Sequence, residues 1–389
     1  MLTSLYIHIP FCVKKCIYCD FFSVPYDEDL ALRYVDALVS EIALRKNDVG
    51  TLRTVYIGGG TPTTLSLICL FRLFRAATNT FSLAEDAEVT IEANPGTINI
   101  EKLRALTNMG VNRLSLGVQS FDNKTLKLLG RIYTFEDVLK AVAAVRDSPV
   151  NNFSIDLIYG IPGQTLAEWQ KALSIILELR PSHVSSYELT PEKGTPLSEK
   201  IAIGELSMPS EDTIIEMYYY AIDRLVASGY RHYEISNFAL PDRECSHNLN
   251  YWNRGEYLGI GAGAHSFANG IRMKNTSDLK KYMDELKKGS LPIEESILIT
   301  SEDAIKEFIF LGLRKMKGLS ITACWNTLRI DIIKASRDLI VDGFLESDGE
   351  CIRLTRRGIV ISSTIIARLL GKLEKEGLGD ISYQPKGGQ

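Results

Sequence analysis

Short apolar strands and amphipathic helices alternate along the chain up to residue 227, and this alternation constrains the fold more than any other feature. Strands are predicted over residues 5–8, 54–57, 88–92, 113–117, 153–158 and 183–187. The intervening helices are predicted over residues 29–46, 65–74, 100–109, 124–129, 134–146, 166–179 and 211–227. Strands that alternate with helices form βαβ crossovers and a parallel sheet. About six such units predict an α/β fold, a partial (β/α)6 barrel with its chemistry at the carboxyl ends of the strands.

The alternation stops near Trp252, which predicts two domains, residues 1–252 and residues 253–389. In the second domain, helices are predicted over residues 277–287, 301–314, 330–343 and 355–370, and a hairpin over residues 344–354. Helices followed by a small hairpin resemble a winged-helix module. Such modules often bind DNA, but Lys and Arg are roughly matched here by Asp and Glu. The balance favours packing or a protein partner over nucleic acid.

The composition argues against several classes of protein. A net charge of −4 gives no basic excess for a nucleic-acid partner. No segment approaches the ~20 apolar residues of a membrane span, and residues 1–10 lack the basic and apolar regions of a secretory signal. Seven cysteines, three of them clustered, are typical of a reducing compartment rather than a disulfide scaffold. We therefore expect a cytoplasmic protein without a membrane span.

The clustered cysteines are Cys12, Cys16 and Cys19. A structural zinc site prefers four ligands, and no fourth Cys or His lies close by in the sequence. Free cysteines are often small buried apolar residues, but Lys14 and Asp20 make this segment polar. Soft thiolates are the ligands of iron–sulfur clusters. Three thiolates on a four-iron cluster would leave one iron open, so the segment predicts a [4Fe-4S] cluster with a site for an outside ligand.

Polar or glycine-rich positions stand at or near several predicted strand ends. Gly58-Gly59-Gly60-Thr61-Pro62 lets a ligand approach the backbone, but no Lys-Ser/Thr pair follows, so it is not a P-loop. A plain tight turn is the alternative. Glu92, Gln119 and Asp156 also lie at or near predicted strand ends. Solvated strand ends or surface charges are the alternative interpretation. Asp156 interrupts an apolar strand, and a buried carboxylate needs partners such as ribose hydroxyls.

His247-Asn248-Leu249-Asn250-Tyr251-Trp252 is a second dense group of functional side chains. A neutral imidazole beside aromatic faces would suit a haem iron and its macrocycle. A polar loop capped by an aromatic anchor is the alternative. Cys245, two residues upstream, is a rival iron ligand. The residue types alone do not decide between these readings.

Together these segments resemble the HemN and HemW subgroup of the radical S-adenosylmethionine (SAM) superfamily. The resemblance lies in Tyr6-Ile7-His8-Ile9-Pro10-Phe11-Cys12, the cysteine spacing, residues 58–62, Gly117-Val118-Gln119-Ser120-Phe121, Asp156-Leu157-Ile158-Tyr159-Gly160-Ile161-Pro162 and the C-terminal module. In this superfamily the amino and carboxylate groups of SAM chelate the open iron. Reductive cleavage of SAM then releases a 5′-deoxyadenosyl radical.

The resemblance implies roles for individual residues. The cluster ligands would be Cys12, Cys16 and Cys19, and the contacts to the iron-bound SAM would come from Tyr6, Gly59 and Glu92. Positions that HemN-type proteins use around SAM, in part for a second SAM molecule, are matched by Tyr18, Gly60, Thr61, Gln119, Arg131 and Asp156. The motif of residues 247–252 resembles the haem-binding motif of HemW. It implies that His247 ligates haem iron, with Tyr251 and Trp252 against the macrocycle.

Two departures from the HemN pattern favour a HemW-like haem chaperone with a radical SAM core. HemN has a fourth cysteine two residues after the third, where this chain has Phe21. HemN also has an N-terminal extension, whereas the first strand here begins almost at Met1. The resemblance implies haem delivery to haem proteins, with respiratory-chain, membrane-associated acceptors and a dimer as candidates. Oxygen-independent decarboxylation of coproporphyrinogen III is the alternative, and radical chemistry on another substrate is a third.

Overall fold

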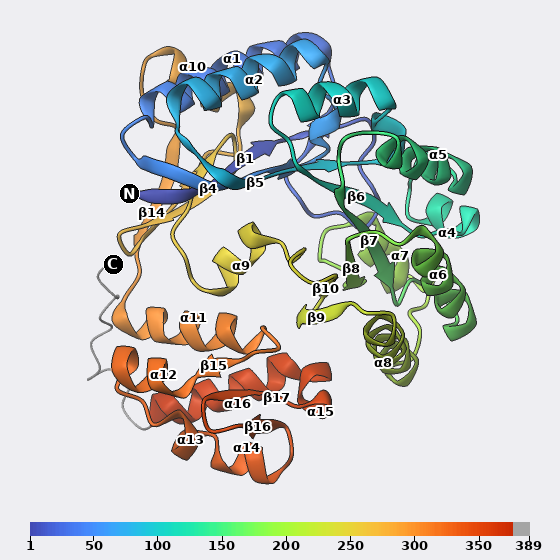
Figure 1. The fold of residues 1–389 in the computed structure, drawn as a ribbon, viewed down its shortest axis with the longest axis vertical. Helices are drawn as coiled ribbons and strands as arrows, with labels where there is room; N and C mark the ends of the chain where they lie inside the picture. The colour runs from blue at the N-terminus through green and yellow to red at the C-terminus, as the bar shows by residue number, and fades with distance from the viewer. Residues whose placement is uncertain (376–389) are drawn as a thin grey trace.

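The computed structural model describes residues 1–375, which form a curved α/β layer and a smaller helical module (Figure 1). Nine strands make up the central sheet, in the order β11-β1-β4-β5-β6-β7-β8-β10-β9. The order has two ends rather than closing into a ring, so the predicted partial barrel is confirmed. Residues 376–389, part of the second expected domain, lie outside the described residues.

Six parallel strands form the middle of this sheet in chain order, because a helical crossover links each strand to the next. Each overlaps a predicted strand. They are β1 (Leu2–Ile9), β4 (Val49–Gly59), β5 (Leu83–Ala93), β6 (Arg113–Gln119), β7 (Asn152–Tyr159) and β8 (His183–Glu188).

Three further strands extend the sheet at its two ends. β10 (Asn237–Ala239) pairs antiparallel with β8, and β9 (Arg231–Glu234) pairs antiparallel with β10. At the other end, β11 (Leu258–Ile260) pairs parallel with β1. The expected domain boundary at residue 252 is therefore wrong: the sheet takes its last strand from beyond that point.

Helices cover the outer face of the sheet, along the top and right of Figure 1. Side chains cap their amino ends: Asp27 accepts a hydrogen bond from the backbone of Leu30, and Thr165 forms a capping box with Glu168. These helices are α1 (Glu28–Leu44), α2 (Leu67–Thr80), α3 (Ile100–Asn108), α4 (Asn123–Leu128), α5 (Phe135–Arg146), α6 (Leu166–Leu179) and α8 (Glu211–Ala227). Helix α7 (Pro196–Ala202) instead packs beside the cysteine segment, where the backbone N–H of Leu197 donates to the Ile17 oxygen.

The two faces of the sheet differ in chemistry, and β6 illustrates the difference. Leu114, Leu116 and Val118 are fully buried in the hydrophobic core beneath the helices. The alternate positions, Arg113 and Ser115 among them, line an inner cavity. Successive side chains of a strand point to opposite faces. The apolar set therefore packs outward against the helices, and the polar set faces the barrel interior.

A three-stranded antiparallel sheet follows β11, in the order β12-β13-β14. Asn269 and Gly270, both at positive φ (51° and 73°), form the turn of its first hairpin. Its elements are β12 (His265–Ala268), β13 (Ile271–Asn275), α10 (Leu279–Lys287) and β14 (Ile293–Leu298). The second expected domain therefore contains strands that were not predicted, in addition to the helix predicted over residues 277–287.

The C-terminal module surrounds a second small sheet, β15-β17-β16. The single helices predicted over residues 330–343 and 355–370 are each divided in two, because Ser336 and Ile361 depart from α-helical dihedral angles. The elements are α11 (Ser301–Leu313), β15 (Leu319–Ser320), α12 (Ile321–Leu328), α13 (Ile332–Ala335), α14 (Arg337–Val341), β16 (Leu345–Ser347), β17 (Cys351–Leu354), α15 (Arg356–Val360) and α16 (Ser362–Lys375).

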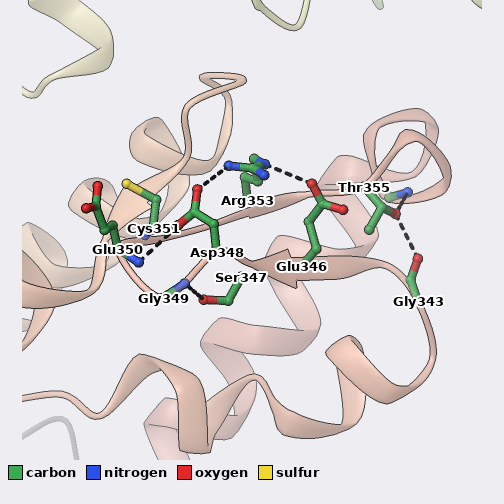
Figure 2. A network of polar contacts seen from close by, with 10 residues as sticks. Gly343, Glu346, Ser347, Asp348, Gly349, Glu350, Cys351, Arg353 and Thr355 are labelled. Carbon is green, nitrogen blue, oxygen red and sulfur yellow. Dashed lines mark hydrogen bonds and ion pairs between the residues drawn. The ribbon is translucent and has the colours of Figure 1, made fainter.

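The predicted hairpin is confirmed, and Asp348 organises its turn (Figure 2). The Asp348 carboxylate accepts hydrogen bonds from the backbone N–H groups of Glu350 at 3.0 Å and Cys351 at 2.8 Å. Arg353 donates to it at 2.7 Å and to Glu346 at 2.8 Å. The backbone bonds and the Arg353 guanidinium lower the pKa of Asp348 to about 2. Arg353 is thus paired with two acidic side chains, which leaves the hairpin a poor surface for nucleic acid.

Helix α9 (Ser246–Trp252) lies between the two ends of the sheet and above the C-terminal module in Figure 1. The polar loop considered as the alternative for this segment is therefore a helix. None of the helices in residues 1–375 is both long and apolar enough to cross a membrane.

Candidate functional site

The inward side of the partial barrel encloses a cavity of about 590 Å³. Branched apolar side chains fill the interior of an ordinary barrel of this kind. Here polar side chains leave a space within the range of about 300–1,000 Å³ found for small-molecule and cofactor sites. The inward positions that line it are Tyr56, Glu92, Arg113, Ser115, Gly117, Gln119, Ser154, Asp156, His183, Ser185 and Tyr187.

Cys12, Cys16 and Cys19 lie together at one side of this cavity. Their segment begins in β2 (Phe11–Cys12) and leads to β3 (Val24–Pro25). All three are partly exposed. Burial raises the pKa values of Cys12 and Cys19 above the ordinary range of a thiol. Binding of a metal group would have to displace these protons, because the thiolate is the ligand.

The three thiols suit an iron–sulfur cluster by their donor type, since soft thiolates are its ligands. Within residues 1–375, no three or more His, Cys, Asp or Glu side chains converge on one metal position. The cysteines of a [4Fe-4S] cluster each ligate a different iron, so they surround a larger volume than the ligands of one ion do.

The glycine segment beside the cysteines requires residues without Cβ at two positions. Gly59 has φ +116°, and an added Cβ would lie 2.6 Å from the ring of His8. A Cβ on Gly60 would lie 2.6 Å from the backbone oxygen of Phe11 and 3.0 Å from Cys12 Sγ. The backbone at Gly59 and Gly60 therefore packs directly against His8 and the cysteine segment. A plain tight turn alone would not explain why both positions require glycine.

Glu92 faces this glycine segment from β5. Its Oε1 accepts a hydrogen bond from the Tyr56 hydroxyl at 2.8 Å, and its Oε2 accepts one from the backbone N–H of Gly59 at 3.1 Å. Burial raises the pKa of Glu92 to about 7. Tyr6, the third residue expected here, stacks on Tyr56 at 6.3 Å and hydrogen-bonds His8 at 3.0 Å. Tyr6 is not among the residues that line the cavity.

Gln119 and Asp156 lie on neighbouring strands at the cavity wall. Gln119 has φ +67°, in the left-handed region, at a bulge in β6. Strain of this kind clusters at functional sites. Asp156 accepts hydrogen bonds from the hydroxyls of Ser115 at 2.7 Å and Ser154 at 2.9 Å. Burial raises the pKa of Asp156, and these hydroxyls oppose the rise.

Tyr18, Thr61 and Arg131 belong to one hydrogen-bonded chain that runs to the cysteines. The Arg131 guanidinium donates to the Tyr18 hydroxyl and, at 3.0 Å, to Asn94 Oδ1. Asn94 donates to Thr61 Oγ1 at 2.9 Å, and Thr61 Oγ1 lies 3.8 Å from Cys12 Sγ. Asn94 is a site residue that the sequence analysis missed. Its place directly after the β5 strand end was the available signal.

Both ring nitrogens of His247, the expected haem ligand, are engaged within the protein. The residue has no exposed surface. Its Nδ1 is 2.8 Å from Thr54 Oγ1, and its Nε2 is 2.8 Å from the Tyr251 hydroxyl. Its ring also stacks on Tyr56 at 5.3 Å. Axial ligation would have to break one of two buried hydrogen bonds.

The aromatic residues of the same motif are likewise engaged. Tyr251 packs edge-on against Tyr257 at 4.7 Å. The Arg314 guanidinium, from the C-terminal module, lies 4.9 Å from the centre of a Trp252 ring. We conclude that helix α9 joins the barrel to the C-terminal module, with His247 as its buried anchor.

We expect His247→Ala to lower the free energy of unfolding by about 2–4 kcal/mol, because it leaves Thr54 and Tyr251 without a buried partner. Chemical denaturation would measure the change, with Tyr251→Phe as a milder variant that removes one of the two bonds. Burial lowers the pKa of His247 to about 3. The unfolded chain binds this proton below about pH 6.5. The His247 contribution to stability should therefore be complete above pH 6.5 and decline toward pH 3. An unchanged denaturation midpoint in His247→Ala would contradict the anchor role.

Several polar residues of the cavity were not found from the sequence. They are Arg113, Ser115, Ser154 and His183, which line it on three strands. Cys245, expected only as a rival iron ligand, also reaches the cavity from the start of α9. The alternation Arg113-Leu114-Ser115-Leu116 was a usable signal, since a period of two places both polar residues on one face.

Comparisons with known proteins cover both parts of the chain. The radical SAM superfamily model matches residues 6–176, and the HemN C-terminal domain model matches residues 299–361. The haem chaperone HemW of Lactococcus lactis is 37% identical, over 94% of this chain and 97% of that protein. The haem chaperone HemW of Bacillus subtilis is 36% identical, over 95% of this chain and all of that protein (100%).

Among solved structures, the coproporphyrinogen III oxidase HemN of Escherichia coli, a radical SAM enzyme, is similar with a TM-score of 0.82. The two chains are 27% identical, and the match covers 94% of this chain and 89% of that one. The similarity therefore includes the C-terminal module as well as the barrel.

Proposed function

The chain belongs to the HemW family of haem chaperones, and we propose that it binds haem and delivers it to haem proteins. The observation that carries the proposal is the end-to-end match to two HemW chaperones, both above 35% identity (37% and 36%). A radical SAM core accounts for the barrel. The protein would thus act in porphyrin metabolism by moving finished haem.

The superfamily implies a [4Fe-4S] cluster and SAM, and the described residues suit both. We propose Cys12, Cys16 and Cys19 as the cluster ligands, since they lie on one side of the cavity. When bound, the cluster supplies an open iron and an electron for SAM. Residues proposed to hold SAM are Tyr6, Tyr18, Gly59, Gly60, Thr61, Glu92, Gln119, Arg131 and Asp156, of which all but Tyr6 line the cavity.

The proposed partners follow from the proposed function. Haem proteins would receive the haem, with membrane-associated respiratory proteins as candidate acceptors and a dimer as a candidate form of the chaperone. We infer a reducing compartment, the cytoplasm, because the seven cysteines are all free and three are proposed as cluster ligands.

Replacing Asp156 by Ala should weaken SAM binding about tenfold or more, because a hydrogen bond to a charged group contributes about 1.5–3 kcal/mol. Gln119→Gly should weaken it as well while tolerating the positive φ of that position. Calorimetry on the reconstituted protein would measure both affinities. Iron content should be unchanged, and the exposed Asp147→Ala should behave like the wild type. If all three variants bound SAM as tightly as the wild type, neither Asp156 nor Gln119 would belong to the SAM site.

A second function, oxidative decarboxylation of coproporphyrinogen III, is favoured by the similarity to HemN. Phe21 stands where HemN has a fourth cysteine, and its side chain is exposed beside the cysteine segment (65%). A residue without a thiol there favours the chaperone.

One experiment separates the two functions. The anaerobically reconstituted protein is titrated with haem, then mixed with an apo haem protein, and haem transfer is followed by absorption. A parallel sample receives coproporphyrinogen III and SAM, and the porphyrin products are analysed. We expect haem binding and transfer without decarboxylated product. Decarboxylation without haem transfer would reverse the assignment.

A further inference from the structure

The hydroxyl of Thr61 is buried beside the first cysteine of the cysteine segment. Thr61 is 3% exposed, and its backbone N–H donates a hydrogen bond to the oxygen of Phe11 at 2.8 Å. Its Oγ1 lies 3.8 Å from Cys12 Sγ, within reach of a hydrogen bond to sulfur. Either group could be the donor at this distance, so the other partners of Thr61 decide the direction of the bond.

The direction follows from the chain of side chains that leads to Thr61. A guanidinium only donates, so Arg131 makes Asn94 Oδ1 the acceptor of their bond at 3.0 Å. The NH₂ group of the same amide then faces Thr61 and donates to its Oγ1 at 2.9 Å. Because Thr61 Oγ1 accepts this bond, its own proton is left for Cys12 Sγ, its other side-chain partner within residues 1–375. The chain therefore ends in a donor that points at a sulfur.

The fold holds the Asn94 amide in this orientation. Asn94 follows the end of β5, and Gly117 on the adjacent strand β6 leaves room for it. A Cβ at Gly117 would lie 2.9 Å from Asn94 Oδ1. The Arg131 guanidinium is held in turn by its bond to the Tyr18 hydroxyl. Turning the amide over would place its NH₂ group against the guanidinium, donor against donor, so the direction of the chain is fixed.

A second hydroxyl lies near the same sulfur. Ser23 Oγ is buried and has no hydrogen-bond partner among residues 1–375. Burial raises the pKa of the Cys12 thiol, and the hydroxyls of Thr61 and Ser23 both oppose the rise. A buried hydroxyl without a partner is unfavourable, and a thiolate at Cys12 would satisfy it. Hydroxyl donors from two segments of the chain thus surround Cys12 Sγ.

We infer that Thr61, positioned by Asn94, donates a hydrogen bond to the Cys12 thiolate and thereby raises the reduction potential of the cluster. The inference rests on the proposed cluster ligands and gives Thr61 a role besides the one proposed toward SAM. Hydrogen bonds to the sulfurs are among the factors that set the potential of an iron–sulfur cluster. Reduction adds negative charge, and a donor at a ligand sulfur stabilises that charge. The bond is strengthened by burial, because the local dielectric is low.

A rival role for Thr61 is confined to SAM binding and packing. In that case, removal of its hydroxyl would change SAM affinity or stability but would leave the potential of the SAM-free cluster unaltered. The reduction potential measured without SAM therefore separates the two roles.

The test is a redox titration of the full-length, anaerobically reconstituted protein without SAM, followed by electron paramagnetic resonance. We expect Thr61→Val to make one-electron reduction about tenfold less favourable, which is a fall of about 59 mV. Thr61→Ser keeps the hydroxyl and should stay near the wild type. Asn94→Ala should lower the reduction constant about threefold, because the Thr61 hydroxyl can then turn away. The exposed Thr78→Val, which removes a hydroxyl from α2, should leave the potential unchanged.

The double variant Thr61→Val/Asn94→Ala tests the order of the chain. Asn94→Ala should lower the potential no further in this background, because the donor that Asn94 positions is already absent. Additive falls would overturn the inference, as would an equal fall in Thr61→Ser and Thr61→Val.

Equal potentials of the wild type and Thr61→Val, at equal iron content, would likewise overturn the inference and leave the proposed cluster ligands standing. If Thr61→Val assembled no cluster, Asn94→Ala would decide, since it leaves Thr61 and the cysteines in place; a potential equal to that of the wild type would overturn the inference. A wild type that assembled no cluster would overturn the proposed ligands and this inference together. Haem transfer is measured separately, so failure of the chaperone function is distinguishable from each of these outcomes.

Discussion

Replacing Cys12, Cys16 and Cys19 by serine together should abolish the iron–sulfur cluster. Serine hydroxyls replace the soft thiolate ligands that iron–sulfur clusters require. The reconstituted wild type should contain about four irons and four sulfides per chain, and the triple variant close to none. Metal analysis and the charge-transfer absorption of the cluster would measure the loss. Each single variant should lose most of the cluster as well, because no other cysteine lines this side of the cavity.

Cys351→Ser is the matched control for this prediction, since it removes a thiol in the C-terminal module. It should retain the full cluster content. If the triple variant kept its iron and sulfide while Cys351→Ser lost them, the cluster ligands would have to be sought outside the barrel.

Replacing Glu92 by Gln should weaken SAM binding about tenfold to a hundredfold and remove much of its pH dependence. The Glu92 carboxylate is proposed to accept a hydrogen bond from the amino group of SAM, and its ionised form is the stronger acceptor. Burial raises the pKa of Glu92 to about 7. SAM affinity should therefore fall as the pH drops below about 7, since the carboxyl becomes neutral.

Calorimetric titrations from pH 5.5 to 8.5 would test this dependence. Glu85→Gln is the control, because it removes an exposed carboxylate from the same strand. It should reproduce the wild-type profile. A wild-type affinity that stayed level between pH 5.5 and 7.5 would show that Glu92 does not bind the SAM amino group in its ionised form.

The strand order of the barrel could be derived from the sequence because its signals are local. An apolar run bounded by glycine at residues 54–60, or a capped amphipathic stretch at residues 165–179, carries its own periodicity. Parallel strands linked by helices then have few possible arrangements. The same reasoning failed at α9, since Leu249 is the only apolar residue between Ser246 and Asn250 and no helical repeat stands out.

The proximity of the cysteines to the glycine segment could also be inferred from the sequence alone. Both depend on spacing along the chain, and β1 and β4 are neighbours in any parallel arrangement of the first two units. The common location of Glu92, Gln119 and Asp156 could be inferred, because the carboxyl ends of parallel strands meet at one edge of the sheet. Their partners could not be inferred. Asn94 reaches Thr61 and Arg131 only because two loops meet in space.

The sequence by itself determined the alternating architecture, the cysteine segment and the strand ends, because each is encoded in residues close together in the chain. Only the tertiary structure decided which polar residues are satisfied. His247 has the residue type of a ligand, yet Thr54, 193 positions away, occupies one of its nitrogens. Arg113 has the residue type of a surface charge, yet the fold buries it, and its Nε has no hydrogen-bond partner among residues 1–375. Burial and hydrogen-bond partnership depend on contacts between distant segments, and periodicity along the chain carries no information about them.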